Sequence, residues 1–205
     1  MYKGILKQCS VKLLRRKGKS LNPKETRGKF NIGKTISKRL KEVRKRKMIG
    51  HWELDTVVSS SGKSKACLST FVERKTRLTK IRLMPNRKYI TFNKYCIEAL
   101  GQFSDTNLKT LTVDCGKEFA GYLELEQKLK VDVFFADPYS SWQRGTNENT
   151  NGLIREFFPK KFDFSTITQN DVDIVKDILN NRPRKCLGYK TPLEVFNEEQ
   201  AKCCT

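Results

Sequence analysis

The chain has 205 residues, of which 37% are hydrophobic and 10% aromatic, enough for one ordinary folded domain with an appendage. Its formal net charge is +20, which indicates a polyanionic partner. No stretch approaches the roughly 20 apolar residues of a membrane-spanning helix, and the basic first 20 residues lack the apolar centre of a signal peptide. These features argue against an integral membrane or secreted protein, and we expect a cytoplasmic one.

The positive charge is unevenly distributed along the chain. Residues 1–50 hold 18 Lys and Arg residues against two Glu, a net charge of +16, so the other 155 residues carry only +4. This asymmetry predicts a flexible basic arm over residues 1–47, followed by a folded domain over residues 48–205. Within the arm, residues 36–43 have the pattern of a short helix.

A run of basic residues, 41–47, closes the predicted arm. Because Lys and Arg side chains release condensed counterions when they neutralise phosphates, we expect Lys45, Arg46 and Lys47 to bind DNA. The alternative is that the arm is only a solubilising leader.

The sequence contains seven cysteines and a single histidine, His51, and no two cysteines have C-x-x-C spacing. A zinc site of standard spacing therefore cannot be assembled. Reduced thiols are expected in a cytoplasmic protein, and the sequence assigns them no role.

Three strands are predicted first. Residues 52–58, 67–72 and 78–83 are rich in strand-forming residues, and the Ser-Gly-Lys-Ser stretch at 61–64 is a turn signal between the first two. The short connections favour an antiparallel meander.

Helices and strands alternate after this meander. Helical patterns are found at 90–103, 119–129, 147–157 and 171–179, strand patterns at 108–113 and 131–135, and a polar loop at 137–145. The order β-β-β-α-β-α-β-α, with a further C-terminal helix, predicts an α/β fold with a mixed five-stranded sheet flanked by helices. This order is similar to that of ribonuclease-H-like folds such as the retroviral integrase core.

Three carboxylates occupy positions suited to a metal site. Asp55 lies in the middle of a strand, Asp114 ends an apolar strand just before a glycine turn, and Glu148 lies at the start of a helix. Each alone is consistent with a turn cap or a favourable charge at a helix N-terminus. If the two strands are neighbours and the helix faces them, the three carboxylates together can bind two Mg²⁺ or Mn²⁺ ions.

Five stretches of the chain carry a family resemblance. They are GHWELDT (50–56), TFVERKT (70–76), VDCGKEF (113–119), FADPYSSWQRGTNENTNGL (135–153) and NNRPRKCLGYKTP (180–192). In these stretches the sequence resembles the DDE transposases of the bacterial insertion sequence thirty (IS30) family, over roughly residues 30–196. The family has 33 residues between its second Asp and its Glu, the same number that separates Asp114 from Glu148.

The resemblance implies that Asp55, Asp114 and Glu148 are the catalytic and metal-binding residues of a transposase. It implies two Mg²⁺ or Mn²⁺ ions, cleavage and strand transfer on transposon ends and target DNA, and a homo-oligomer at the bacterial nucleoid. No membrane and no small-molecule cofactor are expected. The alternatives are a metal-dependent nuclease without strand transfer and an inactive DNA-binding remnant.

Further DNA contacts are predicted around the third carboxylate. Arg155 stands seven residues after Glu148 on the same helix face and is expected to contact a phosphate. Arg144 and Trp142, on the preceding loop, are expected to brace or stack on DNA. The alternatives are a solvated charge for Arg155 and a loop-pinning role for Trp142.

Supporting residues and departures complete the comparison with the family. Supporting roles at the site are expected for His51, Trp52, Glu53, Glu118 and Asn149, although Trp52 also fits the core and Glu118 a surface charge. Cys115 replaces a polar residue expected after the second Asp. The match begins near residue 30, so we expect the family's N-terminal helix-turn-helix region, which recognises the transposon ends, to be missing from this sequence.

Overall fold

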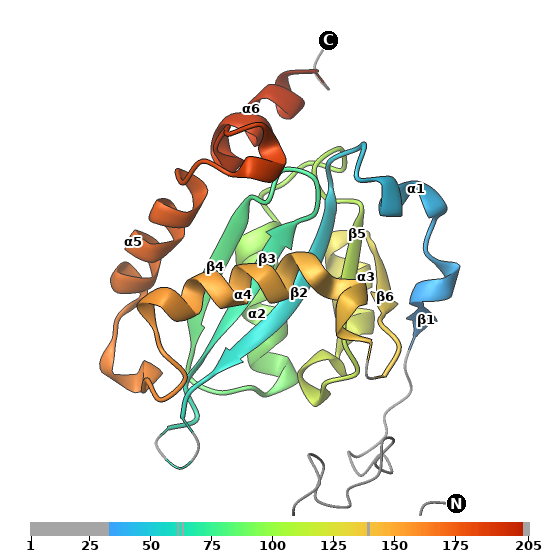
Figure 1. Cartoon of the computed structure of the whole chain (residues 1–205). Coiled ribbons are helices and arrows are strands. Elements are labelled where there is room, and N and C mark those ends of the chain that lie inside the picture. Colours follow the sequence, from blue (N-terminus) through green and yellow to red (C-terminus); the bar gives the residue numbers. More distant parts are fainter. Residues whose placement is uncertain (1–32, 61, 63, 139, 203–205) are drawn as a thin grey trace, which may run out of the picture.

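The computed structural model describes residues 33–60, 62, 64–138 and 140–202. A six-stranded mixed sheet lies at its centre, in the order β1-β6-β5-β2-β3-β4 (Figure 1). The strands are β1 (Lys34–Thr35), β2 (His51–Val58), β3 (Cys67–Glu73), β4 (Thr79–Met84), β5 (Thr110–Val113) and β6 (Asp132–Phe135). As predicted, β2, β3 and β4 form an antiparallel meander, whereas β5 joins β2 in parallel and β6 joins β5 in parallel. The predicted count of five strands is one too low, because β1 adds to the edge beside β6.

The sixth strand comes from the segment predicted as a basic arm. Besides β1, this segment forms the 3-10 turn η2 (Ile36–Lys38) and the short helix α1 (Lys41–Lys45). Ile36 and Val43 are buried, and the Arg39 guanidinium donates to Thr112 Oγ1 at 2.9 Å. The flexible arm predicted over residues 1–47 therefore does not include residues 34–45, and residues 1–32 lie outside the described ranges.

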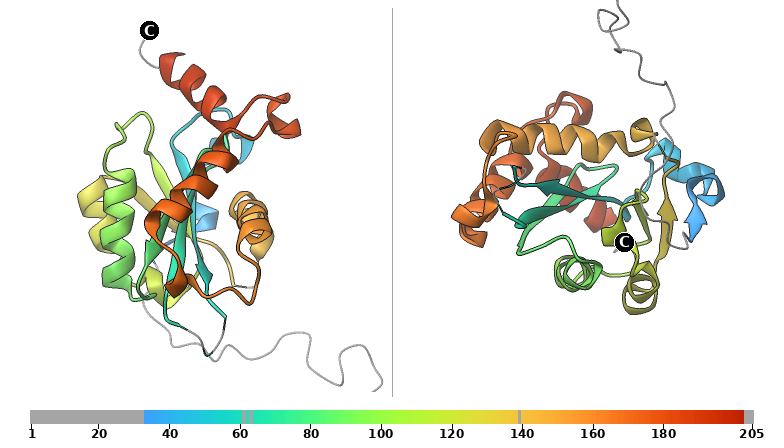
Figure 2. Two further views of the ribbon diagram at one scale, coloured as in Figure 1. Left: turned by 90° about the vertical axis from the view of Figure 1, so that its left-hand side faces the viewer. Right: turned by 90° about the horizontal axis from the view of Figure 1, so that it is seen from below.

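Helices cover both faces of the sheet (Figure 2). They are α2 (Tyr89–Leu100), α3 (Tyr122–Leu129), α4 (Gly145–Phe157), α5 (Gln169–Asn180) and α6 (Pro192–Lys202), with 3-10 turns η3 (Lys117–Phe119), η4 (Ser141–Arg144), η5 (Phe164–Thr166) and η6 (Lys185–Leu187). Helices α2 and α3 lie on one face, and α4 lies across the other. The helix predicted at 119–129 is divided into η3 and α3. The C-terminal helix predicted at 171–179 is α5, and α6 is a further helix that follows it. None of the described helices is long and apolar enough to cross a membrane.

Strand β2 separates two hydrophobic clusters. Trp52 and Leu54 belong to the cluster beneath α2 and α3, whereas Val57 belongs to the one beneath α4 and α5. Because successive side chains of a strand point to opposite faces, Glu53 and Asp55 share the face of Val57 and lie toward α4. The core role considered for Trp52 is confirmed, since it is fully buried and its Nε1 donates to the Asn107 carbonyl at 2.9 Å.

His51 begins β2 in a buried, electropositive position. Its Nδ1 lies 2.8 Å from Thr110 Oγ1. Burial, with smaller effects from nearby Lys109 and other cations, lowers the pKa of His51 from 6.5 to about 4. The imidazole is therefore neutral in the folded protein at neutral pH.

This pKa predicts a loss of stability in mild acid. Unfolded His51 takes up a proton near pH 6.5, whereas folded His51 does so only near pH 4. The stability that the neutral imidazole contributes is therefore fully present above pH 6.5, and it is lost as the pH falls from there through about 4. Between pH 7.5 and 4.5, the wild-type free energy of unfolding should fall by about 2 kcal/mol more than that of His51→Gln. Urea titrations at both pH values measure the difference, and identical pH dependences in the two proteins would contradict it.

Candidate active site

Two of the three predicted carboxylates come from neighbouring strands. In the parallel pairing of β2 with β5, Glu53 lies opposite Thr112. The same register, continued by two residues along each strand, puts Asp114 beside Asp55. The condition set by the sequence, that the strands carrying the two Asp residues be neighbours, is therefore met.

Arg144, at the end of η4, joins the two aspartates. Its Nη1 lies 3.1 Å from Asp55 Oδ2, and its Nη2 lies 3.1 Å from Asp114 Oδ2. Nη1 also donates to the carbonyl of Leu54 at 3.3 Å. Both carboxylates thus direct an oxygen at one positive charge.

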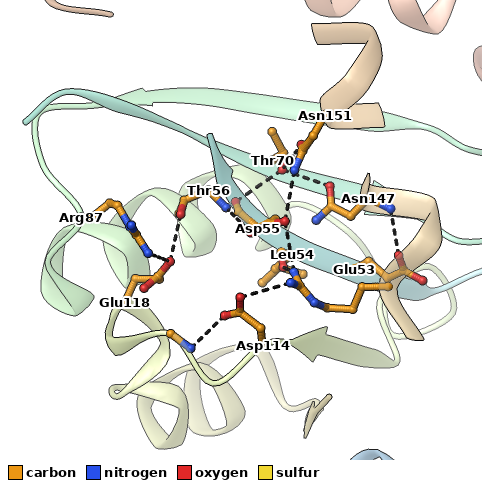
Figure 3. Close-up of polar contacts among 12 residues, drawn as sticks. Glu53, Leu54, Asp55, Thr56, Thr70, Arg87, Asp114, Glu118, Asn147 and Asn151 are labelled. Atoms are coloured by element: carbon orange, nitrogen blue, oxygen red, sulfur yellow. Dashed lines mark hydrogen bonds and ion pairs between the residues drawn. The ribbon is translucent and has the colours of Figure 1, made fainter. Parts of the chain in front are cut away.

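Asp55 is further held by neutral donors. The backbone N–H of Thr56 donates to its Oδ1 at 2.8 Å, and Asn151 Nδ2 donates to its Oδ2 at 3.1 Å (Figure 3). Burial raises the pKa of Asp55; Arg144 opposes this effect and Asp114 adds to it. A nearby cation therefore favours the charged form of this buried carboxylate.

Asp114 depends on the glycine turn that follows it. The backbone N–H of Gly116 donates to Asp114 Oδ1 at 2.8 Å. A Cβ on Gly116 would lie 2.5 Å from Glu118 Oε2 and 2.8 Å from Asp114 Oδ1, too close for either oxygen. Glycine is thus required here by close packing.

Glu118 is part of this packed turn. It is only 2% exposed, and its carboxylate accepts from Thr56 Oγ1 at 2.9 Å and from the Arg87 guanidinium (Figure 3). The alternative of a surface charge is therefore wrong. Thr56 is the residue after Asp55, and Glu118 lies in the turn that begins just after Asp114. The hydrogen bond from Thr56 to Glu118 therefore links the two segments that carry the aspartates.

Helix α4 is fastened to the sheet by Glu53. This carboxylate is fully buried, forms an ion pair with buried Arg74, and accepts from the backbone N–H of Asn147 at 2.9 Å. Thr70, opposite Asp55 on β3, lies 3.0 Å from Asn147 Oδ1 and 3.1 Å from Asn151 Oδ1 through its hydroxyl. The sequence signal for this role was only the shared face of Glu53 and Asp55.

The third carboxylate is not joined to the other two. Glu148 is exposed on α4, four residues after Arg144. Within the described residues, no three His, Cys, Asp or Glu side chains are grouped to hold a metal ion. The aspartate pair alone fits a hard divalent cation, because it offers carboxylate oxygens to a single positive charge.

The predicted DNA contacts differ in their surroundings. Trp142 is 74% exposed, so its alternative role of pinning the loop is wrong, and Lys45 and Lys47 are exposed as well. Arg155 is not a freely solvated charge, because it donates to the carbonyls of Val58, Phe158 and Pro159 at 2.8–3.3 Å. Arg46 donates to Thr146 Oγ1 at 3.1 Å.

Comparisons with known proteins show which proteins have a similar sequence. Residues 45–141 match the integrase core domain family. The chain is 42% identical to the transposase InsI of IS30C from Escherichia coli (strain K12), over 88% of this chain and 47% of the relative. It is 38% identical to the transposase of IS4351 from Bacteroides fragilis, over 91% of this chain and 58% of the relative. It thus spans about half the length of the curated relatives it matches.

A solved structure shares the fold. The catalytic core domain of BIV integrase has a TM-score of 0.59 with this chain at 16% identity, covering 76% of this chain and 98% of that one. This similarity confirms the predicted integrase-like, ribonuclease-H-like α/β fold.

The Glu53 anchor leads to a prediction about stability. Glu53→Ala would leave Arg74 buried without its ion-pair partner and the first turn of α4 without its acceptor. We expect the free energy of unfolding to fall by about 3–5 kcal/mol. Glu98→Ala, which removes an exposed pair with Lys94 on α2, should cost about 1 kcal/mol or less. Urea denaturation compares the two variants, and equal small losses would show that Glu53 is not an anchor.

Proposed function

We propose that this chain, a member of the IS30-type transposases with their integrase core domain, is the catalytic part of an enzyme that cuts and joins DNA. The observation that carries the proposal is the pairing of Asp55 on β2 and Asp114 just after β5 around one positive charge. A site of paired carboxylates on rigid elements suits displacement at a phosphodiester.

In this proposal Asp55 and Asp114, joined by Glu148, hold two Mg²⁺ or Mn²⁺ ions. Such ions activate the attacking oxygen and stabilise the leaving oxygen. Because a guanidinium and a divalent cation cannot occupy the same position between two carboxylates, Arg144 has to leave when a cation binds. Glu53 keeps α4 fixed to β2 meanwhile, so the helix retains its place while Arg144 moves.

The reaction that follows from the family is two successive displacements. Water first attacks a phosphodiester at the end of the element, breaking one P–O bond and freeing a 3′-OH. This hydroxyl then attacks a phosphodiester of target DNA, forming one P–O bond and releasing another hydroxyl. The chain's residues act by positioning and charge, with no covalent bond between protein and DNA.

The same proposal assigns the residues outside the carboxylate pair. Exposed Trp142 would stack on an unpaired base, and Arg144, once released, would contact a phosphate. Arg155 would reach DNA only by giving up some of its internal carbonyl contacts, so we expect it to contribute less than Arg144. The functional partners would be element ends and target DNA, bound by a homo-oligomer at the nucleoid, with the basic residues 1–32 adding contacts to phosphates.

Substitution of the carboxylates tests the chemistry. Asp114→Asn and Glu148→Gln should each abolish Mg²⁺-dependent joining of a labelled DNA duplex with a free 3′-OH to a second duplex, while DNA binding persists. Glu156→Gln, further along α4 and paired only with Arg182 at the surface, should join DNA as the wild type does. Cleavage without joined products in the wild type would identify a nuclease instead, and DNA binding without metal-dependent chemistry would identify an inactive remnant.

A stability measurement tests the metal site independently of activity. Mn²⁺ at a hundred times its Kd should stabilise the wild type by about 2.7 kcal/mol, because it binds only the folded state. Asp114→Asn should lose this stabilisation, and an undiminished effect in that variant would place the cation elsewhere.

Deletion of residues 1–32 tests the arm. These residues hold ten Lys and Arg against Glu25 alone, a net charge of +9. The deletion should weaken non-specific DNA binding and flatten its salt dependence by about 0.9 in log–log slope for each phosphate contact removed. The cut must stop at residue 32, because Ile36, Arg39 and Val43 pack against the sheet. A salt slope identical to that of the full chain would rule out the role.

A further inference from the structure

A cavity of about 270 Å³ lies beside the first turns of α4 and has no part in the carboxylate site. Its walls come from four separate segments: the end of α1, the turn between β3 and β4, the start of α4 and the link between α5 and α6. The lining residues are Arg46, Arg77, Gly145, Asn149, Thr150, Arg184 and Cys186.

The three arginines of this cavity form no ion pair with any residue that the structure describes. Arg46 and Arg77 both donate to one hydroxyl, Thr146 Oγ1, at 3.1 and 2.9 Å. Arg184 donates to the Leu179 carbonyl at 3.2 Å. In the part of the chain that the structure describes, none of the three arginines belongs to an ion pair, and the Nε atoms of Arg77 and Arg184 are buried without an acceptor. A neutral hydroxyl cannot balance two guanidinium charges, so the cavity is short of negative charge.

Backbone conformation and electrostatics indicate that this arrangement is under strain. Arg46 and Arg77 have φ values of 51° and 66°, in the left-handed region that residues with a Cβ rarely adopt. Burial, followed by repulsion from Arg77, lowers the pKa of Arg46. Three neighbouring cations repel one another, so this cluster is not the arrangement expected if the arginines served only to hold the loops in place.

We propose that this cavity binds a backbone phosphate of the DNA strand that the enzyme acts on. The inference rests on the proposed function and adds a place where the substrate is held. Three guanidiniums offer planar donors suited to phosphate oxygens, and the start of α4 adds the positive end of a helix dipole. Buried N–H groups without acceptors would gain partners from the ligand.

The position of the cavity relative to the carboxylates supports this role. Gly145, Asn149 and Thr150 line the cavity, whereas Arg144 and Asn151 contact Asp55. Spacing along a helix therefore puts the cavity and the aspartate pair on opposite flanks of α4. A strand anchored by one phosphate in the cavity would cross the exposed face of α4, where Glu148 lies, to reach the aspartates.

Cys186 offers a direct measurement, because it lines the cavity and is exposed. The full-length chain carrying Asp114→Asn is treated with iodoacetamide, and alkylation of each cysteine is followed by mass spectrometry. DNA at ten times its Kd should slow alkylation of Cys186 about tenfold, since about nine-tenths of sites are then filled. Inorganic phosphate at matched ionic strength should also slow it if the anion alone suffices.

Variants show whether the arginines cause the protection. Arg184→Gln should lose most of the protection at Cys186 and reduce the log–log salt slope of DNA binding by about 1. Lys185→Gln changes the neighbouring exposed residue, which does not line the cavity, and should keep the protection. Far-ultraviolet circular dichroism confirms that both variants fold.

Cys115 separates the possible outcomes, because it lies beside Asp114 in a different hollow. DNA that protects Cys115 but not Cys186 would overturn the cavity proposal while leaving the proposed function intact. Protection of Cys186 by phosphate but not by DNA would make it a site for free anions and also overturn the proposal. Failure of DNA to bind at all would overturn both.

Discussion

The buried carboxylate of Glu53 is the interaction on which the candidate site depends. It neutralises Arg74 and accepts the backbone N–H of Asn147, so it connects β2, the end of β3 and the first turn of α4. A buried ion pair contributes little net stability compared with an apolar core of the same volume, because both charges lose their water. Its role here is to position α4. Arg74 holds the Glu53 carboxylate in place, and that carboxylate accepts the Asn147 N–H at the start of the helix.

The rest of the geometry follows from backbone periodicity. Asp55 is two residues beyond Glu53, so the alternation of a strand directs both side chains toward α4. The parallel pairing of β2 with β5 sets Asp114 beside Asp55, and the close packing of Gly116 against Asp114 and Glu118 fixes the strand end. Arg144, just before α4, then meets both aspartates because the helix start is already in place.

The sequence was sufficient for the elements whose patterns are strong. The β-rich runs gave the meander, and the lone carboxylates at Asp55 and Asp114 marked the site because an ionisable group in an apolar strand needs a partner. It was insufficient where a pattern was diluted: the short helix expected over residues 36–43 is displaced to Lys41–Lys45, and the basic residues around Ile36 hid the two-residue strand β1. Contacts between distant segments, such as Glu118 with Thr56 or Arg144 with both aspartates, carry no local signal and require the fold.

The two flanks of α4 carry opposite charge, and this constrains how a substrate can be held. On one flank Arg144 forms ion pairs with both aspartates. Because Arg144 is part of the chain, its side chain would have to move away before a metal ion could take its place. On the other flank three arginines line a cavity, and none of them forms an ion pair with a described residue. DNA brings negative charge and divalent ions bring positive charge, so their joint binding would satisfy both flanks at once. The helix that Glu53 fixes would then set the distance between a bound phosphate and the bond to be broken.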